Sequence, residues 1–383
     1  MAKEDFKGEP TEIDFETGGS VSTFNSKLFY IKKKLYAFKN PYVGNKRKIA
    51  PDIIKTIDNH GITYDSVLDL FCGSASMSMA FKILGKSVAC NDIMLSCYMN
   101  AIAFVLNGDV ILSDNEKRFL LSNNPDCDIH SFFSAYKDRF TDNEIKFLNN
   151  YHYNIDELFS PFLSDGLTVI KRALCIAYIQ NYIMEHCMVG GRLNNGQVLA
   201  KLEHRMNHAR NRDRKTNKGM EMSFKDVRWN EPIPDTPGSN YNVFSQDAIY
   251  LLENLKEFDI SPDLCYIDPP YGGEQSDYSS MFDFLEGYVN LQTKEERDNK
   301  EARVKFVNSG NYYDNFKSLM KATIKIPWIV ISYNDSSWGN IDEISSVIKE
   351  SRSEVIVEEF EYSYKYRKDS KKKAKEYLIL SKV

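Results

Sequence analysis

The sequence predicts an α/β fold, with a mostly parallel sheet whose last strand is antiparallel and a mainly helical domain inserted into it. Short apolar runs rich in β-branched residues alternate with helical patterns in the first and last parts of the chain. This alternation is typical of parallel βαβ units. It stops between residues 107 and 240, where polar and aromatic helical patterns take over. The last two apolar runs have no helix between them, so they predict a hairpin.

The strands that we expect from these runs are short and end in polar, Gly or Pro residues. They cover residues 66–70, 87–90, 242–245, 264–267, 328–333, 354–360 and 377–383. Helical patterns follow at residues 76–84, 94–106 and 247–258. The predicted division is therefore one α/β domain built from residues 1–106 and 241–383, with residues 107–240 as the inserted helical domain.

The composition and charge of the chain limit the classes of protein to which it can belong. The chain has 383 residues, of which 42% are hydrophobic, enough for a sizeable core. Its net charge of -5 argues against uniform attraction to nucleic acid, but basic blocks at residues 27–48, 205–218 and 368–375 predict a local positive face. The seven cysteines are irregularly spaced without a CxxC pair, which predicts neither a disulfide framework nor a zinc site. The best apolar run, residues 173–189, contains polar residues and no signal peptide opens the chain, so we expect a cytoplasmic protein without membrane contact.

The first chemical motif follows the first predicted strand and opens a helix. It contains Asp69, Phe71, Cys72, Gly73 and Ser74. Gly73 would let a ligand approach the backbone, and the new helix presents unpaired amide groups. The next strand ends at Asp92, where dinucleotide-binding folds hold ribose hydroxyls. The glycine fingerprint for a pyrophosphate is incomplete, which favours an adenosine cofactor without phosphates, S-adenosylmethionine. A tight turn with a helix-capping acid is the alternative for the glycine turn alone.

The second motif, Asp268-Pro269-Pro270-Tyr271, ends the fourth predicted strand. The prolines fix a rigid turn, the carboxylate and main-chain carbonyls are acceptors, and the tyrosine offers a stacking face. Acceptors beside an aromatic ring suit the exocyclic amine of a planar base. They would orient its lone pair toward an electrophilic methyl group without a metal. A base in a duplex must be flipped out to reach such a pocket.

Together the two motifs resemble the Dam-type DNA adenine methyltransferases, in which the cofactor motif precedes the catalytic one. The stretch PYVGNKRK resembles that family's N-terminal motif. The resemblance implies a Rossmann-like S-adenosylmethionine-dependent methyltransferase sheet, with Tyr42 and Lys46 at the methionine end of the cofactor. It also implies that Asp247 contacts the cofactor's adenine and that Asp268 lies close to the cofactor. Ala75 departs from the family pattern, which often has a second glycine there.

The resemblance further implies site-specific methylation of adenine in double-stranded DNA, with S-adenosylhomocysteine as the product. A restriction-modification, phage or epigenetic context in a bacterial, phage or archaeal cell is expected. A cognate restriction endonuclease would act on the same site without being a bound subunit. The residue types in the insertion predict base contacts by Arg192, Asn194, Asn195 and Gln197. Other DNA contacts, several of them to phosphates, are expected from Arg205, Arg210, Arg212, Lys215, Lys371 and Lys372.

Three alternatives remain at this point. An RNA adenine methyltransferase would share the same chemistry. A DNA-binding regulator with a degenerate cofactor pocket is disfavoured by the presence of Asp92, Asp268 and Tyr271 together. A nicotinamide oxidoreductase is disfavoured by the incomplete glycine fingerprint.

Overall fold

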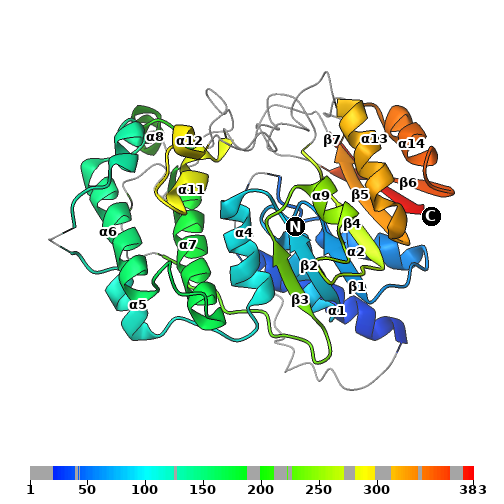
Figure 1. Cartoon of the computed structure of the whole chain (residues 1–383), viewed down its shortest axis with the longest axis horizontal. Coiled ribbons are helices and arrows are strands. Elements are labelled where there is room, and N and C mark those ends of the chain that lie inside the picture. Colours follow the sequence, from blue (N-terminus) through cyan, green and yellow to red (C-terminus); the bar gives the residue numbers. More distant parts are fainter. Residues whose placement is uncertain are drawn as a thin grey trace, which may run out of the picture.

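The computed structural model describes residues 20–38, 42, 44–124, 127–187, 199–210, 222, 227–270, 281–297, 312–334, 339–362 and 374–383. A seven-stranded sheet in the order β3-β2-β1-β4-β5-β7-β6 forms its centre (Figure 1). The strands are β1 (Ser66–Asp69), β2 (Ser87–Asn91), β3 (Tyr241–Phe244), β4 (Leu264–Ile267), β5 (Trp328–Asn334), β6 (Glu354–Tyr362) and β7 (Ala374–Lys382).

The sheet is mixed in the way that the sequence predicts. The pairs β1–β2, β1–β4, β2–β3 and β4–β5 are parallel, and β7 is antiparallel to both of its neighbours. β7 lies inside the sheet because its apolar run Leu378, Ile379 and Leu380 is buried on both faces. β6 takes the edge, where Glu358 and Glu359 are partly exposed. The predicted fold class, including the antiparallel closing hairpin, is confirmed.

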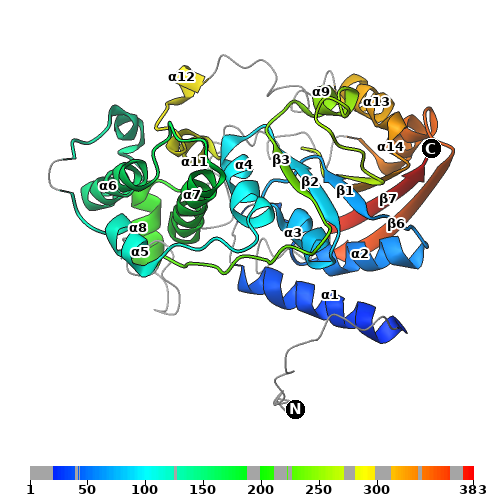
Figure 2. The ribbon, with the colours of Figure 1, turned by 60° about the horizontal axis from the view of Figure 1, so that its bottom comes forward.

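Helices cover both faces of the sheet, and alternate side chains of each strand belong to different cores (Figure 2). Val67 and Val330 lie in the core under α1 (Ser20–Ala37), α2 (Ala50–Asn59) and α3 (Ser76–Ile83). Leu68, Ile329 and Ile331 point to the opposite core. This second core is covered by α9 (Ala248–Glu253), α13 (Tyr312–Ala322) and α14 (Ile341–Lys349), and η7 (Thr323–Lys325) links α13 to β5.

A helical lobe lies beside the β3 edge of the sheet (Figure 1). Its connection to the sheet is α4 (Leu95–Ala101), which continues as the π-helix η1 (Ile102–Leu106) and packs on α7. The lobe contains α5 (Asp114–Leu120), the 3₁₀-helix η2 (Ser131–Tyr136), α6 (Asp142–Leu158), α7 (Gly166–Cys187) and α8 (Leu202–Arg210). Ser113 and Thr141 begin α5 and α6 with capping boxes.

Two later helices join this lobe although they follow the fourth strand in sequence. They are α11 (Asp283–Tyr288) and α12 (Lys294–Arg297). Tyr288 donates a hydrogen bond to the carbonyl of Leu148 at 2.7 Å, and Gln180 donates to the carbonyl of Leu285 at 3.0 Å. The lobe is thus assembled from two separate parts of the chain, whereas the boundaries 107–240 for the inserted domain stay a prediction.

No helix in the described part of the chain combines the length and the apolar character that crossing a membrane requires.

Candidate active site

Three aspartates lie where the central parallel strands end. Asp69 is the last residue of β1, Asp92 follows β2 and Asp268 follows β4. Because β1 pairs in parallel with both β2 and β4, these residues emerge at one edge of the sheet. In open α/β sheets this carboxyl edge is where ligands bind.

The motif after β4 carries a partly exposed carboxylate, that of Asp268. All four residues of β4 are buried, whereas the side chain of Asp268 is 17% exposed. Pro269 is buried and Pro270 half-buried, as expected for a rigid turn under a ligand site. Lys46 Nζ lies 3.3 Å from Asp268 Oδ1. Tyr271 lies outside the described residues, so its expected stacking role stays a prediction.

Asp69 is a buried carboxyl group, and only one of its two oxygens accepts a hydrogen bond from the described residues. Its side chain is 1% exposed. Ser78 donates a hydrogen bond to its Oδ2 at 2.5 Å, and Oδ1 has no hydrogen-bond partner among the described residues. Burial raises the pKa of Asp69 to about 7, and the negative charges of Asp268 and Asp92 add to the rise.

Asp92 holds the glycine turn through main-chain amides. Its Oδ2 accepts from the Gly73 amide at 2.9 Å and its Oδ1 from the Met94 amide at 3.0 Å. Burial raises the pKa of Asp92 to about 6. Each carboxylate oxygen keeps acceptor capacity beyond these bonds, so the expected contact with ribose hydroxyls is compatible with this geometry.

The turn between β1 and α3 uses two left-handed residues. Gly73 has φ +49° and Ala75 has φ 60°. Glycine adopts this conformation without strain, but the Cβ of alanine makes it unfavourable. The structure therefore gives a physical reason for a second glycine at the position where this chain has Ala75.

Tyr42 and Lys46 approach this edge from the segment between α1 and α2. A Cβ on Gly73 would lie 3.4 Å from the Tyr42 ring, so the ring borders the turn. The ring stacks on Phe282 with centroids 4.4 Å apart, and Cys97 donates to its hydroxyl at 3.4 Å. Lys46 is 4% exposed and forms a second ion pair, with Glu376 of β7.

The remaining predicted cofactor residues have local roles in the structure. Asp247 caps α9, where its Oδ1 accepts from the amides of Ile249 and Tyr250 at 3.0 and 3.1 Å. Ser74 shares a hydrogen bond of 2.8 Å with Ser76. Cys72 is buried and Phe71 is half-buried. Their predicted contacts with a cofactor remain predictions.

The charges at this edge favour a cationic ligand. Lys46 pairs with Asp268 and Glu376, and the charges of Asp268 and Asp92 act on Asp69, so four carboxyl groups accompany one ammonium here. Sulfonium and ammonium groups would compensate such an excess of acid, whereas a pyrophosphate would be repelled. The residues present therefore fit the cofactor that the sequence predicts. Within the described ranges, no three His, Cys, Asp or Glu side chains come close enough together to hold a metal ion.

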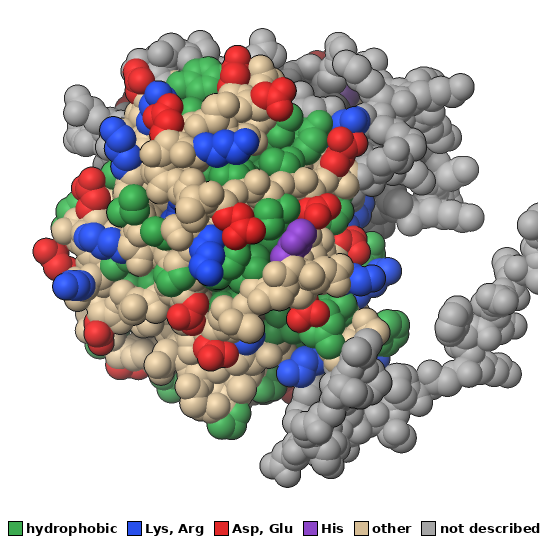
Figure 3. Space-filling view, turned by 90° about the vertical axis from the view of Figure 1, so that its right-hand side faces the viewer, with side chains coloured by type: hydrophobic (Ala, Val, Ile, Leu, Met, Phe, Trp, Pro, Cys, Tyr) green, Lys and Arg blue, Asp and Glu red, His purple; other side chains and the backbone are tan. Residues whose placement is uncertain are grey.

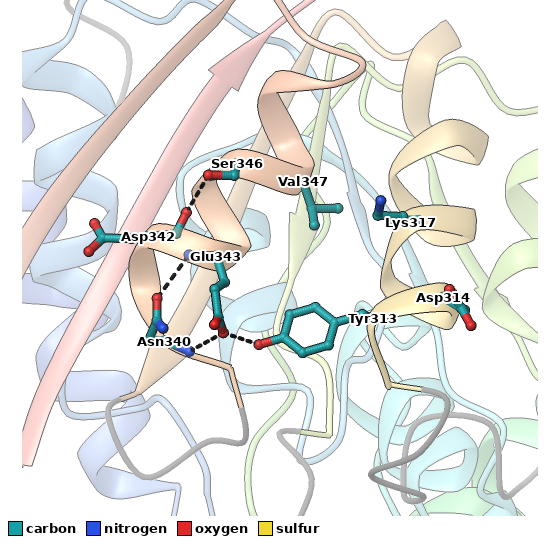
Figure 4. A pocket seen from close by; sticks show the side chains of 8 residues that line it. All are labelled: Tyr313, Asp314, Lys317, Asn340, Asp342, Glu343, Ser346 and Val347. Atoms are coloured by element: carbon teal, nitrogen blue, oxygen red, sulfur yellow. Dashed lines mark hydrogen bonds between the residues drawn. The ribbon is translucent and has the colours of Figure 1, made fainter.

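A hollow elsewhere on the molecule has a different character. It has a volume of about 560 Å³ and lies between α13 and α14 (Figure 4). Asn340 and Glu343 form the capping box of α14 there, and Tyr313 donates to Glu343. The hollow contains none of the residues that the sequence analysis predicts for the site, and its polar groups cap a helix.

Comparison with known families identifies the chain. Residues 42–347 match the model of the D12 class N6 adenine-specific DNA methyltransferases. The chain belongs to this family. It is also 25% identical over 346 residues to the type II methyltransferase M2.HphI of Haemophilus parahaemolyticus, with 88% of this chain and 96% of that protein covered. Neither the RNA methyltransferase nor the regulator or oxidoreductase alternative is favoured by these matches.

As a D12 class enzyme, the protein transfers a methyl group to adenine in DNA. The match begins at Tyr42 and contains all three aspartates of the carboxyl edge. The residues described above are therefore the candidates for the reaction site. The nitrogen to be methylated is the exocyclic amine, a donor, and the three aspartates offer acceptors.

The predicted DNA contacts of this methyltransferase require one correction. Arg205 was expected at the DNA, but its side chain is fully buried and forms an ion pair of 2.6 Å with the equally buried Glu144 of α6. It therefore stabilises the helical lobe and cannot reach a phosphate in this structure. Arg210 is the last residue of α8. The other predicted contacts lie outside the described residues: Arg192, Asn194, Asn195, Gln197, Arg212, Lys215, Lys371 and Lys372.

The surface on the opposite side from the lobe shows no preference for one charge. Viewed over α14 and β6, acidic and basic side chains alternate among the described residues (Figure 3). A DNA-binding face of such an acidic protein requires clustered Lys and Arg side chains. This face therefore does not have the character of the DNA-binding side of the methyltransferase.

Sequence reasoning missed three residues that support the methyltransferase site. Glu376 pairs with Lys46, and Phe282 stacks on Tyr42. Glu286 of α11 accepts hydrogen bonds from the first amides of α4, those of Leu95 and Ser96, both at 2.9 Å. Only Glu376 had a readable signal, because it is a charged residue at the start of the apolar run that closes the chain.

Proposed function

We propose that this DNA adenine methyltransferase uses S-adenosylmethionine and methylates the exocyclic amine of an adenine that is flipped out of double-stranded DNA at a specific sequence. The observation that carries the proposal is the convergence of Asp69, Asp92 and Asp268 at the middle of the carboxyl edge, with Lys46 beside Asp268. When bound, the cofactor supplies an electrophilic methyl group on a sulfonium.

In this proposal the cofactor is held by the acids around the glycine turn. Asp92 binds the ribose hydroxyls with the acceptor capacity that its two amide contacts leave. Asp69 offers its second oxygen to a cationic group, and Gly73 with Tyr42 lines the opening. Lys46, which pairs with Asp268 and Glu376, is the cation that we place beside a carboxylate of the cofactor.

The catalytic work is positional and electrostatic. Asp268 and the carbonyls of the adjoining prolines accept hydrogen bonds from the amine and turn its lone pair away from the ring. Asp268 can do this because its carboxylate remains partly exposed at the tip of a rigid turn. Tyr271 would hold the flipped base by stacking, worth on the order of 1–3 kcal/mol. This scheme uses no metal, so we expect methylation to continue in excess EDTA.

A restriction-modification role follows from the relative rather than from the site. The name of the Haemophilus protein describes a type II methyltransferase. We infer that the present enzyme protects a recognition sequence against a separate endonuclease that reads the same site. Arg192, Asn194, Asn195 and Gln197 are the proposed base-reading residues, on the strength of their side-chain chemistry.

The test measures methyl transfer by the full-length protein from labelled S-adenosylmethionine to duplex DNA and to structured RNA, followed by sequencing that detects modified bases. We expect methylation of adenine in duplex DNA alone, at one sequence. Asp268→Ala should lower the rate at least about a hundredfold. Asp65→Ala is the matched control, because Asp65 is fully exposed before β1 at the opposite edge. Equal rates for Asp268→Ala and the native enzyme would overturn the assignment.

A further inference from the structure

Helix α4 begins beside the glycine turn and is capped by an acid from another helix. Its N-cap residue, Met94, makes no side-chain capping bond to any described amide. The first two amides of the helix, those of Leu95 and Ser96, donate instead to the two carboxylate oxygens of Glu286, both at 2.9 Å. Glu286 belongs to α11, lies 191 residues after Leu95 and is 1% exposed. A buried carboxylate that is remote in sequence therefore satisfies the start of α4.

A second aspartate of the same sheet shows how Asp92 would act without this cap. Asp247 follows β3 as Asp92 follows β2. One oxygen of Asp247 accepts from the amides two and three residues later, at 3.0 and 3.1 Å, and so caps α9. Of the corresponding two amides, Asp92 accepts only that of Met94, at 3.0 Å. The other, that of Leu95, donates to Glu286.

This division of the amides keeps Asp92 at the glycine turn. Its second oxygen accepts from the Gly73 amide at 2.9 Å, so one carboxylate joins the turn to the start of α4. If the Leu95 amide lost its acceptor, it would compete for the Asp92 carboxylate, because a buried amide without a partner is costly. The Asp92 side chain would then rotate toward α4 and away from Gly73.

The rest of α11 also contacts the surroundings of the turn. Phe282, which precedes the helix, stacks on the ring of Tyr42 with the two planes 1° apart. That ring borders Gly73. Gln180 of α7 donates to the carbonyl of Leu285 at 3.0 Å and so fixes α11 to the helical lobe. The helix therefore supports the aromatic and the acidic side of the turn together.

We propose that Glu286 is a positioning residue for cofactor binding, which takes the first amides of α4 and so keeps the Asp92 carboxylate directed at the glycine turn, where the ribose of the cofactor binds. The inference rests on the proposed binding of S-adenosylmethionine by Asp92. Glu286 acts through Asp92 and does not itself touch the cofactor.

The decisive variant is Glu286→Gln, which keeps the shape of the side chain but replaces one acceptor oxygen by a donor. One of the two helix amides then needs Asp92, and we expect the Kd for S-adenosylmethionine, measured by calorimetry, to rise about tenfold. At saturating cofactor and DNA, kcat should change less than about twofold, because only binding is lost. Glu296→Gln is the matched control, since Glu296 is exposed and accepts from the Thr293 amide at the start of α12. It should bind the cofactor as the native protein does.

The pH dependence of binding is a readout that a loss of stability alone would not move. Burial is the main cause of the raised pKa of Asp92, about 6, and the negative charge of Glu286 adds to it. The other titratable groups around Asp92 are Cys97 of α4, Cys72 of the turn and Asp69 of β1, and all stay in the variant. Removing the charge of Glu286 lowers the pKa of Asp92. The loss of cofactor affinity on acidification should therefore begin at a lower pH in the variant than in the native protein.

A proline at the start of α4 separates positioning from support of the fold. Leu95 is the first residue of α4, where proline is tolerated, and Met94 before it is extended, with φ -79° and ψ 127°, as a following proline requires. Leu95→Pro removes the amide that would compete for Asp92. In the Glu286→Gln background it should restore the cofactor affinity to within about threefold of Leu95→Pro alone. A role in stability alone would give no recovery.

The outcomes distinguish this inference from the proposed function. If the native protein binds S-adenosylmethionine and Glu286→Gln binds it equally well, or if Leu95→Pro restores nothing, the positioning role is wrong while the function stands. If Asp92→Ala keeps native affinity, the proposed cofactor site fails first. Should Glu286→Gln not fold, Glu286→Asp takes its place, because it keeps the charge but reaches less far. Weaker binding that Leu95→Pro restores would then support the role, and native affinity would overturn it.

Discussion

Aspartates at the two ends of the parallel strands differ in their hydrogen bonding and in their pKa. At the amino edge, Asp263 before β4 accepts from the amides of Asp65 and Ser66 and from the Ser66 hydroxyl, at 2.8–2.9 Å. Although burial acts to raise its pKa, these hydrogen bonds hold the pKa of Asp263 below its usual value. At the carboxyl edge, burial raises the pKa of Asp69 to about 7, and one of its oxygens has no partner among the described residues.

We interpret this difference as one between a structural acid, Asp263, and an acid with a proposed ligand-binding role, Asp69. A carboxylate whose hydrogen bonds join two strands stabilises the sheet, and Asp263 does this through Oδ2, which accepts all three bonds. A buried carboxyl group with spare acceptors lowers stability and persists where function needs it. The acid at the amino edge is therefore structural, whereas Asp69 at the carboxyl edge keeps one acceptor oxygen that we propose a ligand uses.

The largest expected loss of stability comes from removing the partner of Glu144, a buried acid in the helical lobe. Glu144 accepts two bonds from the guanidinium of Arg205 and one from the amide of Met222. Arg205→Ala would leave this carboxylate buried without its counter-charge and should cost about 3–5 kcal/mol of stability. Denaturant unfolding measures the loss. DNA affinity of the folded fraction should stay native, and a selective loss of affinity would restore Arg205 as a DNA contact.

The next largest loss of stability is expected from removing Asp263, which joins two strands at the amino edge of the sheet. Asp263→Ala deprives two amides and one hydroxyl of their acceptor and should lower the free energy of unfolding by about 1–2 kcal/mol. Methylation per folded molecule should not change, because Asp263 lies at the other end of β4. A large loss of activity at unchanged stability would remove the contrast between the two edges.

Cofactor binding should depend on pH because of the raised pKa values of Asp69 and Asp92, about 7 and about 6. A cationic ligand prefers the ionised carboxylates, so binding should release protons and tighten about tenfold between roughly pH 6 and pH 8. Calorimetry in buffers of different ionisation enthalpy measures both. Asp69→Asn should flatten most of this dependence, and native binding that is already flat would contradict the assignment of Asp69.

The raised pKa of Asp69 also determines whether the stability of the cofactor-free protein rises or falls with pH. A folded-state pKa above the unfolded value means that the folded protein binds the proton more tightly. The stability from this source is fully present below the unfolded pKa of Asp69. It is lost as the pH rises through about 7. Asp69→Asn should reduce this decline, which thermal unfolding at a series of pH values can detect.

The smallest expected effect is a gain. Ala75 has φ 60° at the start of α3, where an alanine is strained. Ala75→Gly removes that strain but adds freedom to the unfolded chain, so the net stabilisation should be about 0.5 kcal/mol. Denaturant midpoints compared at equal slope measure it. A destabilised variant would show that packing of the buried methyl group outweighs the backbone conformation.

The sequence predicted the sheet well because its signals are local. The apolar runs, the glycine turn and the residues Asp268-Pro269-Pro270 are all contiguous, and their order along the chain places them at one edge. Arg205 was misjudged because its partner Glu144 lies 61 residues earlier. A basic block on a helix resembles a solvated or DNA-facing surface until tertiary contacts are known.

Glu376 was missed by the sequence analysis by a single residue. The expected strand began one residue later, at Tyr377, so the acid fell outside the pattern. Had it been included, the alternation Glu376, Leu378 and Leu380 would have placed a carboxylate on a core face of the sheet. Its partners still could not have been named, because Lys46 is 330 residues away in sequence.

The most direct test of the account compares the acids that flank β4, as Asp268→Asn and Asp263→Asn, in single-turnover methylation of duplex DNA at saturating cofactor. Asparagine keeps the size of each side chain but replaces one acceptor oxygen by a donor. The account predicts a loss of at least about a hundredfold for Asp268→Asn and a native rate for Asp263→Asn. Equal rates for the two variants would contradict the claim that the carboxyl edge of the sheet holds the acceptors for the adenine amine.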